Sequence, residues 1–340
     1  MDTLKLLEEL VAIPGPPGQE ILVRRALEAH LDGLGLKHRT DAKGNLLVGA
    51  EKPRIVVTAH MDEIAMIVRG IDMAGRLIVG PLGGIFPWKT GEGPVQILAA
   101  EALNGVLSFG SIHTEDKASN VRRADRTGID WEMVRVLTGM GPAQIRSKGV
   151  RPGTRVAIHP SRRTVTSLGS LIGSYFLDDR ADLVAWLLVL EELKEVEGVL
   201  FAATAAEEVG GEGALYVLQE FRPEICVALE LGPNAIDAAV EISDQPTVWA
   251  SDSYATMAAG DGDLIESLGR SLNMQLQFQV LSRGGSDASC AASHGLCGRP
   301  ITLGLPMDNS HGFEIMHPNA MTELARLTVA LLAGLAAERS

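Results

Sequence analysis

Residues 55–63 read IVVTAHMDE, and the fold class can be inferred from this segment. Its first five residues form a short, apolar and largely β-branched run, which is typical of a strand buried on both faces of a parallel sheet. The run ends in His60, with Asp62 and Glu63 just behind it. A buried strand that carries these side chains to its carboxyl end predicts an α/β sheet with a functional site at that edge.

Three other apolar runs also lead into chemically active side chains. They are residues 198–206, which precede Glu207 and Glu208; residues 226–232, which contain Glu230; and residues 300–306, which precede His311. Because functional groups gather beyond the carboxyl ends of strands in open α/β sheets, we expect these places to converge. Two imidazoles and several carboxylates form a ligand set that suits Zn²⁺ and its neighbours.

The pattern along the chain predicts one domain interrupted by another. Leucines at helical spacing predict a helix over residues 3–12, and further helices are expected over 19–33, over 179–196 and at the C-terminus. Residues 65–160 instead contain short strand-like pieces, many glycines and a polar loop over 111–128, which favours a small barrel or sandwich. We therefore predict a mixed-sheet α/β catalytic domain with helices on both faces, formed by residues 1–64 and 164–340. An all-β insertion over 65–163 interrupts it.

Composition excludes several classes of partner. The formal net charge of −13 argues against nucleic acid and against an anionic membrane surface. Three cysteines, Cys226, Cys290 and Cys297, form no CxxC pair and no complete disulfide framework, which fits a reducing compartment. The first fifteen residues lack the apolar core of a signal peptide, and no apolar run approaches the length needed to cross a bilayer. A cytoplasmic protein is therefore expected.

Each candidate site residue also has a purely structural interpretation. An isolated His60 is more often a satisfied core histidine, but Asp62, two residues on, can orient a metal-binding imidazole. Asp178 and Asp179 precede a predicted helix, where an aspartate is a good N-cap. The doubled aspartate shifts the interpretation toward a metal ligand.

Glu207 and Glu208 are hard to explain structurally, because adjacent carboxylates at the end of an apolar strand are costly unless paired or bound to metal. Neighbouring strand side chains point to opposite sides. One glutamate can therefore bind metal while the other handles protons.

Four motifs in order carry a resemblance over nearly the whole chain. They are His60-Met61-Asp62-Glu63, Leu177-Asp178-Asp179-Arg180, Glu207-Glu208-Val209-Gly210 and Gly284-Gly285-Ser286-Asp287-Ala288. With the opening LVAIPGPPGQE of residues 10–20, the sequence resembles the tetrahedral aminopeptidase family, which includes glutamyl and deblocking aminopeptidases. Any single motif is weakly specific, but four in order are strongly so.

The resemblance implies a phosphorylase/hydrolase-like catalytic domain and a role for each motif. The metal ligands would be His60, Glu208, Glu230 and His311, and Asp178 would bridge both metals. In that family the peptide bond from this aspartate to the next residue, here Asp179, is often cis. Glu207 would be the general base. The inserted β domain would mediate dimer contacts, and such dimers often assemble into hollow dodecamers.

Two positions depart from the family pattern. Glu230 stands where the family usually carries aspartate, which bears on metal spacing. The last ligand usually lies in an Arg-Tyr-x-His-Ser context, whereas here residues 308–314 read DNSHGFE. His317 is a rival ligand, but the position of His311 relative to Pro306 matches the family spacing.

The expected activity is metal-dependent removal of N-terminal residues from short peptides with a free N-terminus, with Glu207 and Asp62 as the catalytic residues. Two divalent ions per subunit are expected, Zn²⁺ or Co²⁺ before Mn²⁺, because nitrogen and oxygen ligands accept all three. A related deacylase or dipeptidase is the nearest alternative, but such enzymes usually carry their extra domain after the later ligands. A glycosidase fits poorly because adjacent glutamates cannot flank a glycosidic bond. An inactive binding relic would usually have lost ligands. The sequence does not identify the preferred N-terminal residue.

Overall fold

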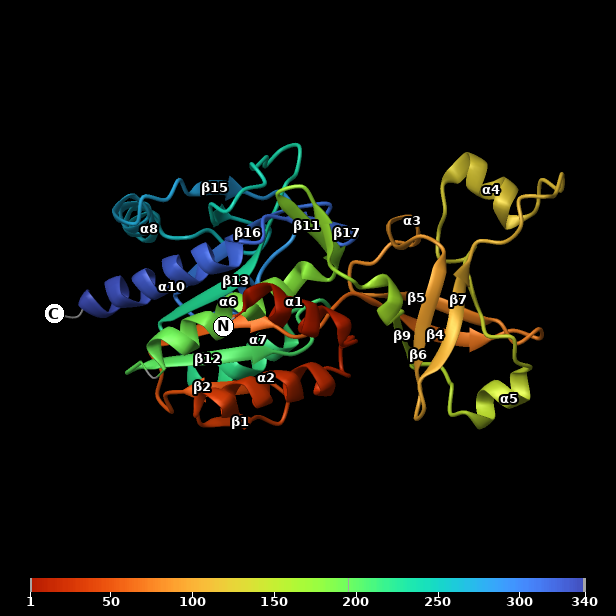
Figure 1. The fold of residues 1–340 in the computed structure, drawn as a ribbon, viewed down its shortest axis with the longest axis horizontal. Coiled ribbons are helices and arrows are strands. Elements are labelled where there is room, and N and C mark those ends of the chain that lie inside the picture. The colour runs from red at the N-terminus through yellow and green to blue at the C-terminus, as the bar shows by residue number, and fades with distance from the viewer. Residues whose placement is uncertain (1, 195, 339–340) are drawn as a thin grey trace.

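The larger lobe of the protein is built on an eleven-stranded mixed sheet in the computed structural model, which describes residues 2–194 and 196–338 (Figure 1). The order along the main path is β1-β2-β12-β3-β13-β16-β17-β11-β10, and β14 pairs with β16 and β15. The strands are β1 (His38–Thr40), β2 (Leu46–Gly49), β3 (Ile55–His60), β10 (Thr166–Leu168), β11 (Leu171–Tyr175), β12 (Val199–Thr204), β13 (Ile225–Pro233), β14 (Thr247–Ser251), β15 (Gln277–Val280), β16 (Arg299–Asp308) and β17 (Phe313–Met316). The central strands β12, β3, β13 and β16 run parallel, so their carboxyl ends share one edge.

Helices cover both faces of this sheet. One face carries α1 (Thr3–Ala12), α2 (Ile21–Leu34), α6 (Leu177–Leu193), α8 (Ala259–Ser271) and α10 (Ala320–Ala337), and the other carries α7 (Glu212–Phe221) and α9 (Asp287–Ser293). Successive strand residues supply the two cores: Val57 and Phe201 pack with the first group, Val56 and Leu200 with the second. The central strands are therefore apolar without alternation, and the predicted α/β fold is confirmed.

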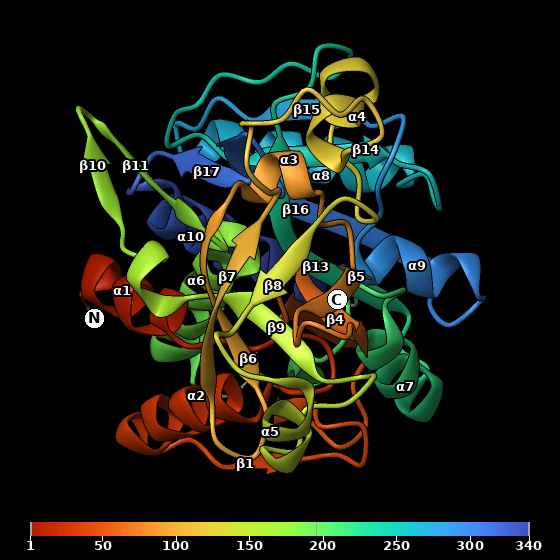
Figure 2. The same ribbon diagram turned by 90° about the vertical axis from the view of Figure 1, so that its right-hand side faces the viewer.

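The smaller lobe is a closed barrel of six strands, and Figure 2 turns it toward the viewer. In barrel order the strands are β4 (Ala65–Ile71), β5 (Leu77–Leu82), β8 (Arg135–Leu137), β7 (Leu103–Ser108), β6 (Gly93–Leu98) and β9 (Arg155–Ile158). Met66 and Val68 point into the barrel core, whereas Arg69 is exposed. Short helical segments connect or follow these strands: α3 (Pro87–Thr90), α4 (Asn120–Thr127), α5 (Pro142–Ser147) and the 3₁₀ turn Pro160–Arg162. The predicted small barrel is confirmed.

Several local predictions were incomplete. The polar segment 111–128 is not all loop, because Ser119 caps α4 through a bond from the Arg122 amide to its Oγ (3.3 Å). Neither α8 nor α9 was predicted, since α8 contains three glycines, which are poor helix formers, and α9 has only seven residues. The helix expected over 179–196 ends at Leu193, and residue 195 lies outside the described residues.

The last helix corrects the expectation that no apolar run approaches membrane-spanning length. Ala320–Ala337 is long enough by number of residues, with a mean hydropathy of 1.4, and half of it is buried. Its buried side chains, such as Leu324 and Leu331, belong to the core beneath the sheet. The helix packs against α6, α8 and β16, as core helices do.

A buried ionic cluster lies where the chain passes between the lobes. Glu63 lies between β3 of the sheet and β4 of the barrel, and Arg163 lies between β9 of the barrel and β10 of the sheet. The Glu63 carboxylate pairs with Arg163 and with Arg180 (2.8 Å), and all three side chains are fully buried. The Arg163 guanidinium also stacks over the Phe176 ring, 4.4 Å from its centroid. We call Glu63, Arg163 and Arg180 the junction cluster.

Candidate active site

The carboxyl edge of the central strands brings the predicted residues together. His60 is the last residue of β3, Glu230 lies within β13, and Glu207 and Glu208 follow β12. Asp178 comes from the start of α6, after Phe176 in the left-handed region (φ 63°). Residues far apart in sequence thus share one edge of the sheet.

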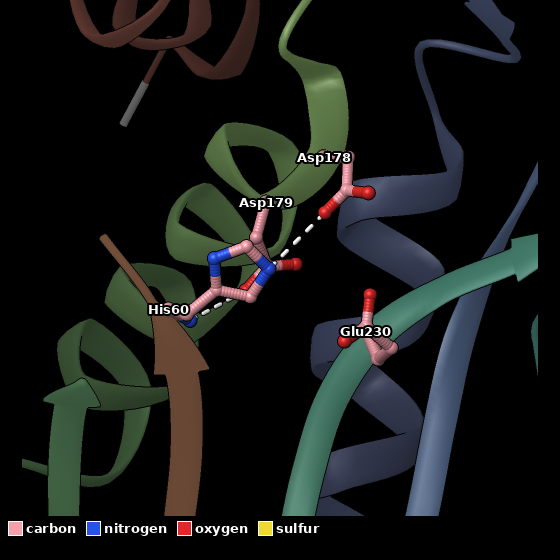
Figure 3. A group of neighbouring side chains, drawn as sticks. All are labelled: His60, Asp178, Asp179 and Glu230. Carbon is pink, nitrogen blue, oxygen red and sulfur yellow. Dashed lines mark hydrogen bonds and ion pairs between the residues drawn. The ribbon is translucent and has the colours of Figure 1, made fainter. Parts of the chain in front are cut away.

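The two aspartates at the start of α6 do not cap the helix. Asp178 and Asp179 have non-helical backbone angles, the N-cap position falls on Phe176, and no side chain makes a capping bond there. The peptide bond between them is cis, as the family resemblance implies. Their carboxylates instead face His60: Nε2 lies 3.1 Å from Asp178 Oδ1, and the backbone N–H donates to Asp179 Oδ2 at 2.6 Å (Figure 3).

The Asp178 carboxylate lies between two histidines. Its Oδ1 faces His60, whereas its Oδ2 lies 3.5 Å from Nε2 of His311. The same nitrogen of His311 is 3.9 Å from Glu208 Oε2. Two groups of side chains could each hold a metal ion, and both include Asp178. One consists of His60, Asp178, Asp179 and Glu230, and the other of Asp178, Glu208 and His311. Within each group, the possible ligand atoms lie within 4.8 Å of one another. Figure 3 shows the first group.

Backbone carbonyls set the tautomers of both histidines. His60 Nδ1 lies 3.1 Å from the carbonyl oxygen of Asp62, and His311 Nδ1 lies 3.0 Å from that of Gly84. A carbonyl can only accept, so each Nδ1 carries the proton. Each Nε2 then faces the carboxylate cluster, where it could give its lone pair to a bound cation, as a metal-binding imidazole does.

Burial disfavours the charged forms of Glu207, Glu208 and Glu230 at this edge. It raises the pKa of Glu208 to about 7, with the nearby charge of Asp178 adding to the effect. Burial also raises the pKa of Glu207 and of Glu230 well above the ordinary glutamate value. Among the described residues, no lysine or arginine forms a salt bridge with Glu207, Glu208, Glu230 or Asp178.

This donor set fits divalent cations. Imidazole nitrogens and carboxylate oxygens suit zinc and its neighbours. Buried carboxylates that lack basic partners are costly, and positive ions among them remove that cost. The arrangement supports divalent metal binding.

Two residues around the site, Glu314 and Gly84, were not singled out from sequence. Glu314 accepts the amide of Asp178 at one oxygen (3.1 Å) and the amide of His311 at the other (2.9 Å), so it ties these two residues together. Burial raises its pKa to about 8. Asp179 holds His60, and Gly84 orients His311. The sequence signal for Glu314 is weak, because it appears only as a buried glutamate in the short strand β17.

The rival ligand lies outside both groups. His317 uses Nδ1 to accept the amide of Asn319 (3.2 Å) and belongs to neither set of ligand atoms. His311, by contrast, has a left-handed backbone (φ 59°) that turns its ring toward Asp178. Between these two histidines, the structure brings His311 to the cluster.

A cavity of about 620 Å³ opens onto the same cluster. The cluster at the carboxyl edge of the central strands contributes six residues to the cavity wall: His60, Asp178, Glu207, Glu208, Glu230 and His311. Trp249, Leu281 and Tyr254 add an apolar side, and Arg283 adds a positive charge. The cavity is large enough for one amino-acid side chain and the start of a peptide.

A mixed α/β sheet whose parallel central strands gather histidines and carboxylates at their carboxyl ends, beside an open cavity, is typical of a metal-dependent hydrolase. Within that class, the chain belongs to the M42 glutamyl aminopeptidase family, whose sequence model matches residues 44–327. The protein is therefore a peptide hydrolase of the aminopeptidase kind.

Known relatives agree on the fold and the activity class but differ in specificity. The chain is 25% identical over 308 residues to a glutamyl aminopeptidase of Lactococcus lactis subsp. cremoris, covering 85% of this chain and 83% of that one. It is 26% identical over 234 residues to a lysyl aminopeptidase of Pyrococcus furiosus, covering 67% and 66%. A solved structure of the TET1 peptidase of Pyrococcus horikoshii superposes with a TM-score of 0.85 at 25% identity, over 97% of this chain and 99% of that one. Since these relatives carry opposite charge preferences in their names, family membership does not identify the preferred residue.

Proposed function

We propose that the protein removes N-terminal residues from short peptides, using two divalent cations that share Asp178. The observation that carries this proposal is the pair of ligand groups joined by one carboxylate, with a histidine facing each oxygen. His60 and Glu230 would hold one cation, and Glu208 and His311 the other. Zn²⁺ and Co²⁺ are the expected ions, with Mn²⁺ third.

Bound cations would polarise the scissile carbonyl and lower the pKa of a nearby water molecule. Glu207 is the proposed general base. It lines the cavity, lies outside both ligand groups, and sits next to the ligand Glu208. Its carboxylate would take the proton from the attacking water and return it to the leaving amine.

Asp62 is proposed to act through other residues. Its carboxylate accepts the amide of Glu207 at Oδ1 (2.9 Å) and the amide of Glu208 at Oδ2 (3.1 Å). Its Oδ1 also lies 3.6 Å from Nδ1 of His60. One side chain thereby supports the proposed base and a ligand of each cation.

The barrel is proposed to pair subunits, with residues 65–163 as the dimerisation domain and 1–64 with 164–340 as the catalytic domain. The Pyrococcus horikoshii structure is described as assembling into a tetrahedron or a large octahedral shell, and another neighbour, at 25% identity, as a dodecamer. These neighbours support a homo-oligomer, and the dimer as its building block is part of the proposal. Three free buried cysteines support a cytoplasmic location, because a reducing compartment keeps thiols unpaired.

Hydrolysis of a matched substrate panel tests the proposal. The protein is stripped with a chelator and reloaded with Zn²⁺, Co²⁺ or Mn²⁺, then offered aminoacyl amides and short peptides with free or acetylated N-termini. We expect cleavage of the free-amine substrates alone, only after metal is restored. Cleavage of only the acetylated set would indicate a deacylase, and no cleavage despite bound metal would contradict the proposed function.

A further inference from the structure

The four residues that follow β12, Ala205 to Glu208, have no neighbouring strand to bond with. The parallel pairing of β12 with β3 ends at Thr204 opposite His60. Ala206, two residues on, has a left-handed backbone (φ 56°), which is unusual for a residue with a side chain. The amides of residues 205–208 therefore need partners from elsewhere, because buried N–H groups without acceptors are costly.

Side chains of the first 62 residues supply an acceptor for every one of these amides. Ala205 N–H donates to Asn45 Oδ1 (2.8 Å), and Ala206 N–H donates to Glu20 Oε1 (3.2 Å). Asp62 accepts from the next two amides, as described above. We call the side chains of Glu20, Asn45 and Asp62 the amide cradle.

The Glu20 side chain also bonds to the loop that precedes α2. Its Oε1 also accepts the amide of Gly18 (2.7 Å), and only 8% of the residue is exposed. No salt bridge to Glu20 is found within residues 2–194 and 196–338, so backbone amides are the groups that it serves. This buried carboxylate thus joins the opening loop to the turn before Glu207.

Asn45 is fixed from two directions. Its Nδ2 donates to Asp41 Oδ2 (2.7 Å) and to the carbonyl of Gly213 at the start of α7 (3.1 Å). These bonds leave its Oδ1 free to accept from Ala205, and the side chain is fully buried. Asn45 therefore clamps both ends of the segment that connects β12 to α7.

We infer that Glu20 and Asn45 are positioning residues for Glu207, which they hold through the backbone of the turn. The inference rests on the proposed role of Glu207 as general base. A displacement of about 1 Å at a reacting group can lower a rate by roughly 100-fold. Loss of the Glu20 acceptor is therefore expected to lower kcat while leaving KM and metal content almost unchanged, since no cavity wall or ligand is removed.

A pair of variants matched in size tests Glu20. Glu20→Met removes the acceptor oxygen, and Glu20→Gln keeps one. We expect Glu20→Met to lower kcat by about 10- to 100-fold with KM within about threefold, and Glu20→Gln to stay within about threefold of wild type. Glu28→Ala is the control, because it removes a carboxylate of α2 that contacts Arg24 and Thr40 instead of the turn.

Amide hydrogen exchange gives a readout that does not depend on activity. Followed by mass spectrometry over residues 200–212, exchange should be faster in Glu20→Met than in wild type, and unchanged in Glu20→Gln. If Glu20→Met fails to fold, Asn45→Ala makes the same test, with faster exchange in this peptide and a kcat reduced by up to about tenfold.

Two failures are distinguishable. A wild-type protein that binds metal but cleaves no substrate counts against the proposed function. An active wild type whose Glu20→Met variant keeps both its kcat and its amide protection overturns the cradle. Equal losses in Glu20→Met and Glu20→Gln also overturn it, because the acceptor oxygen would then not be what matters.

Discussion

The junction cluster and the active site both bury glutamates close to the end of β3, yet they balance charge in opposite ways. At the junction, Glu63 lies between Arg163 and Arg180, and the protein supplies the positive charge itself. At the active site, Glu207 and Glu230 have no basic side chain in salt-bridge contact among the described residues. The junction is therefore balanced by the protein's own charges, whereas the candidate active site lacks the positive charge that a bound divalent metal would supply.

The largest effect expected from this comparison is at Glu207. Glu207→Gln keeps the shape of the side chain but removes the basic oxygen, so kcat should fall by about 10²- to 10⁴-fold. Metal content should stay the same, because Glu207 belongs to neither ligand group. Steady-state kinetics together with elemental analysis check both statements. Wild-type turnover in this variant would show that another group takes the proton.

A substitution in the junction cluster should instead lower the free energy of unfolding. Glu63→Ala leaves two buried guanidinium groups without their carboxylate, and breaking a buried ion pair from one side costs about 3–5 kcal/mol. Denaturant unfolding of the metal-loaded protein measures this loss of unfolding free energy. A loss below about 1 kcal/mol, in the range of exposed pairs, would mean that the cluster is not a buried ionic unit.

Removing metal from the candidate active site should also lower the free energy of unfolding, by less than the Glu63→Ala substitution does. Chelation is expected to lower the free energy of unfolding by about 3–4 kcal/mol relative to protein with free metal at 100 to 1,000 times the dissociation constant. Thermal unfolding with and without Zn²⁺ makes the measurement. The Glu63→Ala variant should show the same metal-dependent difference, since the junction cluster lies outside both ligand groups.

The stability of the metal-free protein should also depend on pH. Burial raises the pKa of Glu208 to about 7 and that of Glu314 to about 8, from an ordinary value of 4.5. The folded protein therefore keeps protons that the unfolded chain releases above about pH 4.5. Its stability should fall as pH rises from about 4.5 to about 8, at up to about 1.4 kcal/mol per proton and pH unit. Urea unfolding at pH 5 and pH 8 measures this, and greater metal-free stability at pH 8 would contradict it.

The smallest effect is expected at the surface. Arg270 and Glu266 pair at 3.1 Å on α8 with both side chains more than half exposed. Exposed pairs at this helical spacing contribute about 0.3–0.5 kcal/mol. Glu266→Ala should therefore change the free energy of unfolding by less than about 0.5 kcal/mol, which makes it the stability control for Glu63→Ala.

The sequence predicted what depends on local pattern. Buried parallel strands produce continuous apolar runs, so the strand ends at His60 and Glu207 could be recognised, and glycine-rich short strands indicated the barrel. What it missed depends on contacts between distant segments. The bond from Ala206 to Glu20 joins residues 186 positions apart, and the bond from Asp178 to Glu314 spans 136. Such contacts are set by how the layers pack, and no periodicity in one segment reveals them.

The roles expected for the aspartates near the site also depended on contacts that the sequence does not reveal. An aspartate before a helix predicts an N-cap, but Asp178 and Asp179 have non-helical backbone angles and their carboxylates bond to His60 instead. Asp62 was expected to orient His60. Its backbone carbonyl is the closer partner of that ring, while its carboxylate bonds to the Glu207 and Glu208 amides.

The proposed function requires that Asp178 joins two cation sites. Anomalous diffraction at the zinc absorption edge, from crystals of the protein loaded with Zn²⁺, tests this requirement. We expect two anomalous peaks, one beside His60 and Glu230 and one beside Glu208 and His311, with the Asp178 carboxylate between them. A single peak, or peaks away from Asp178, would contradict it.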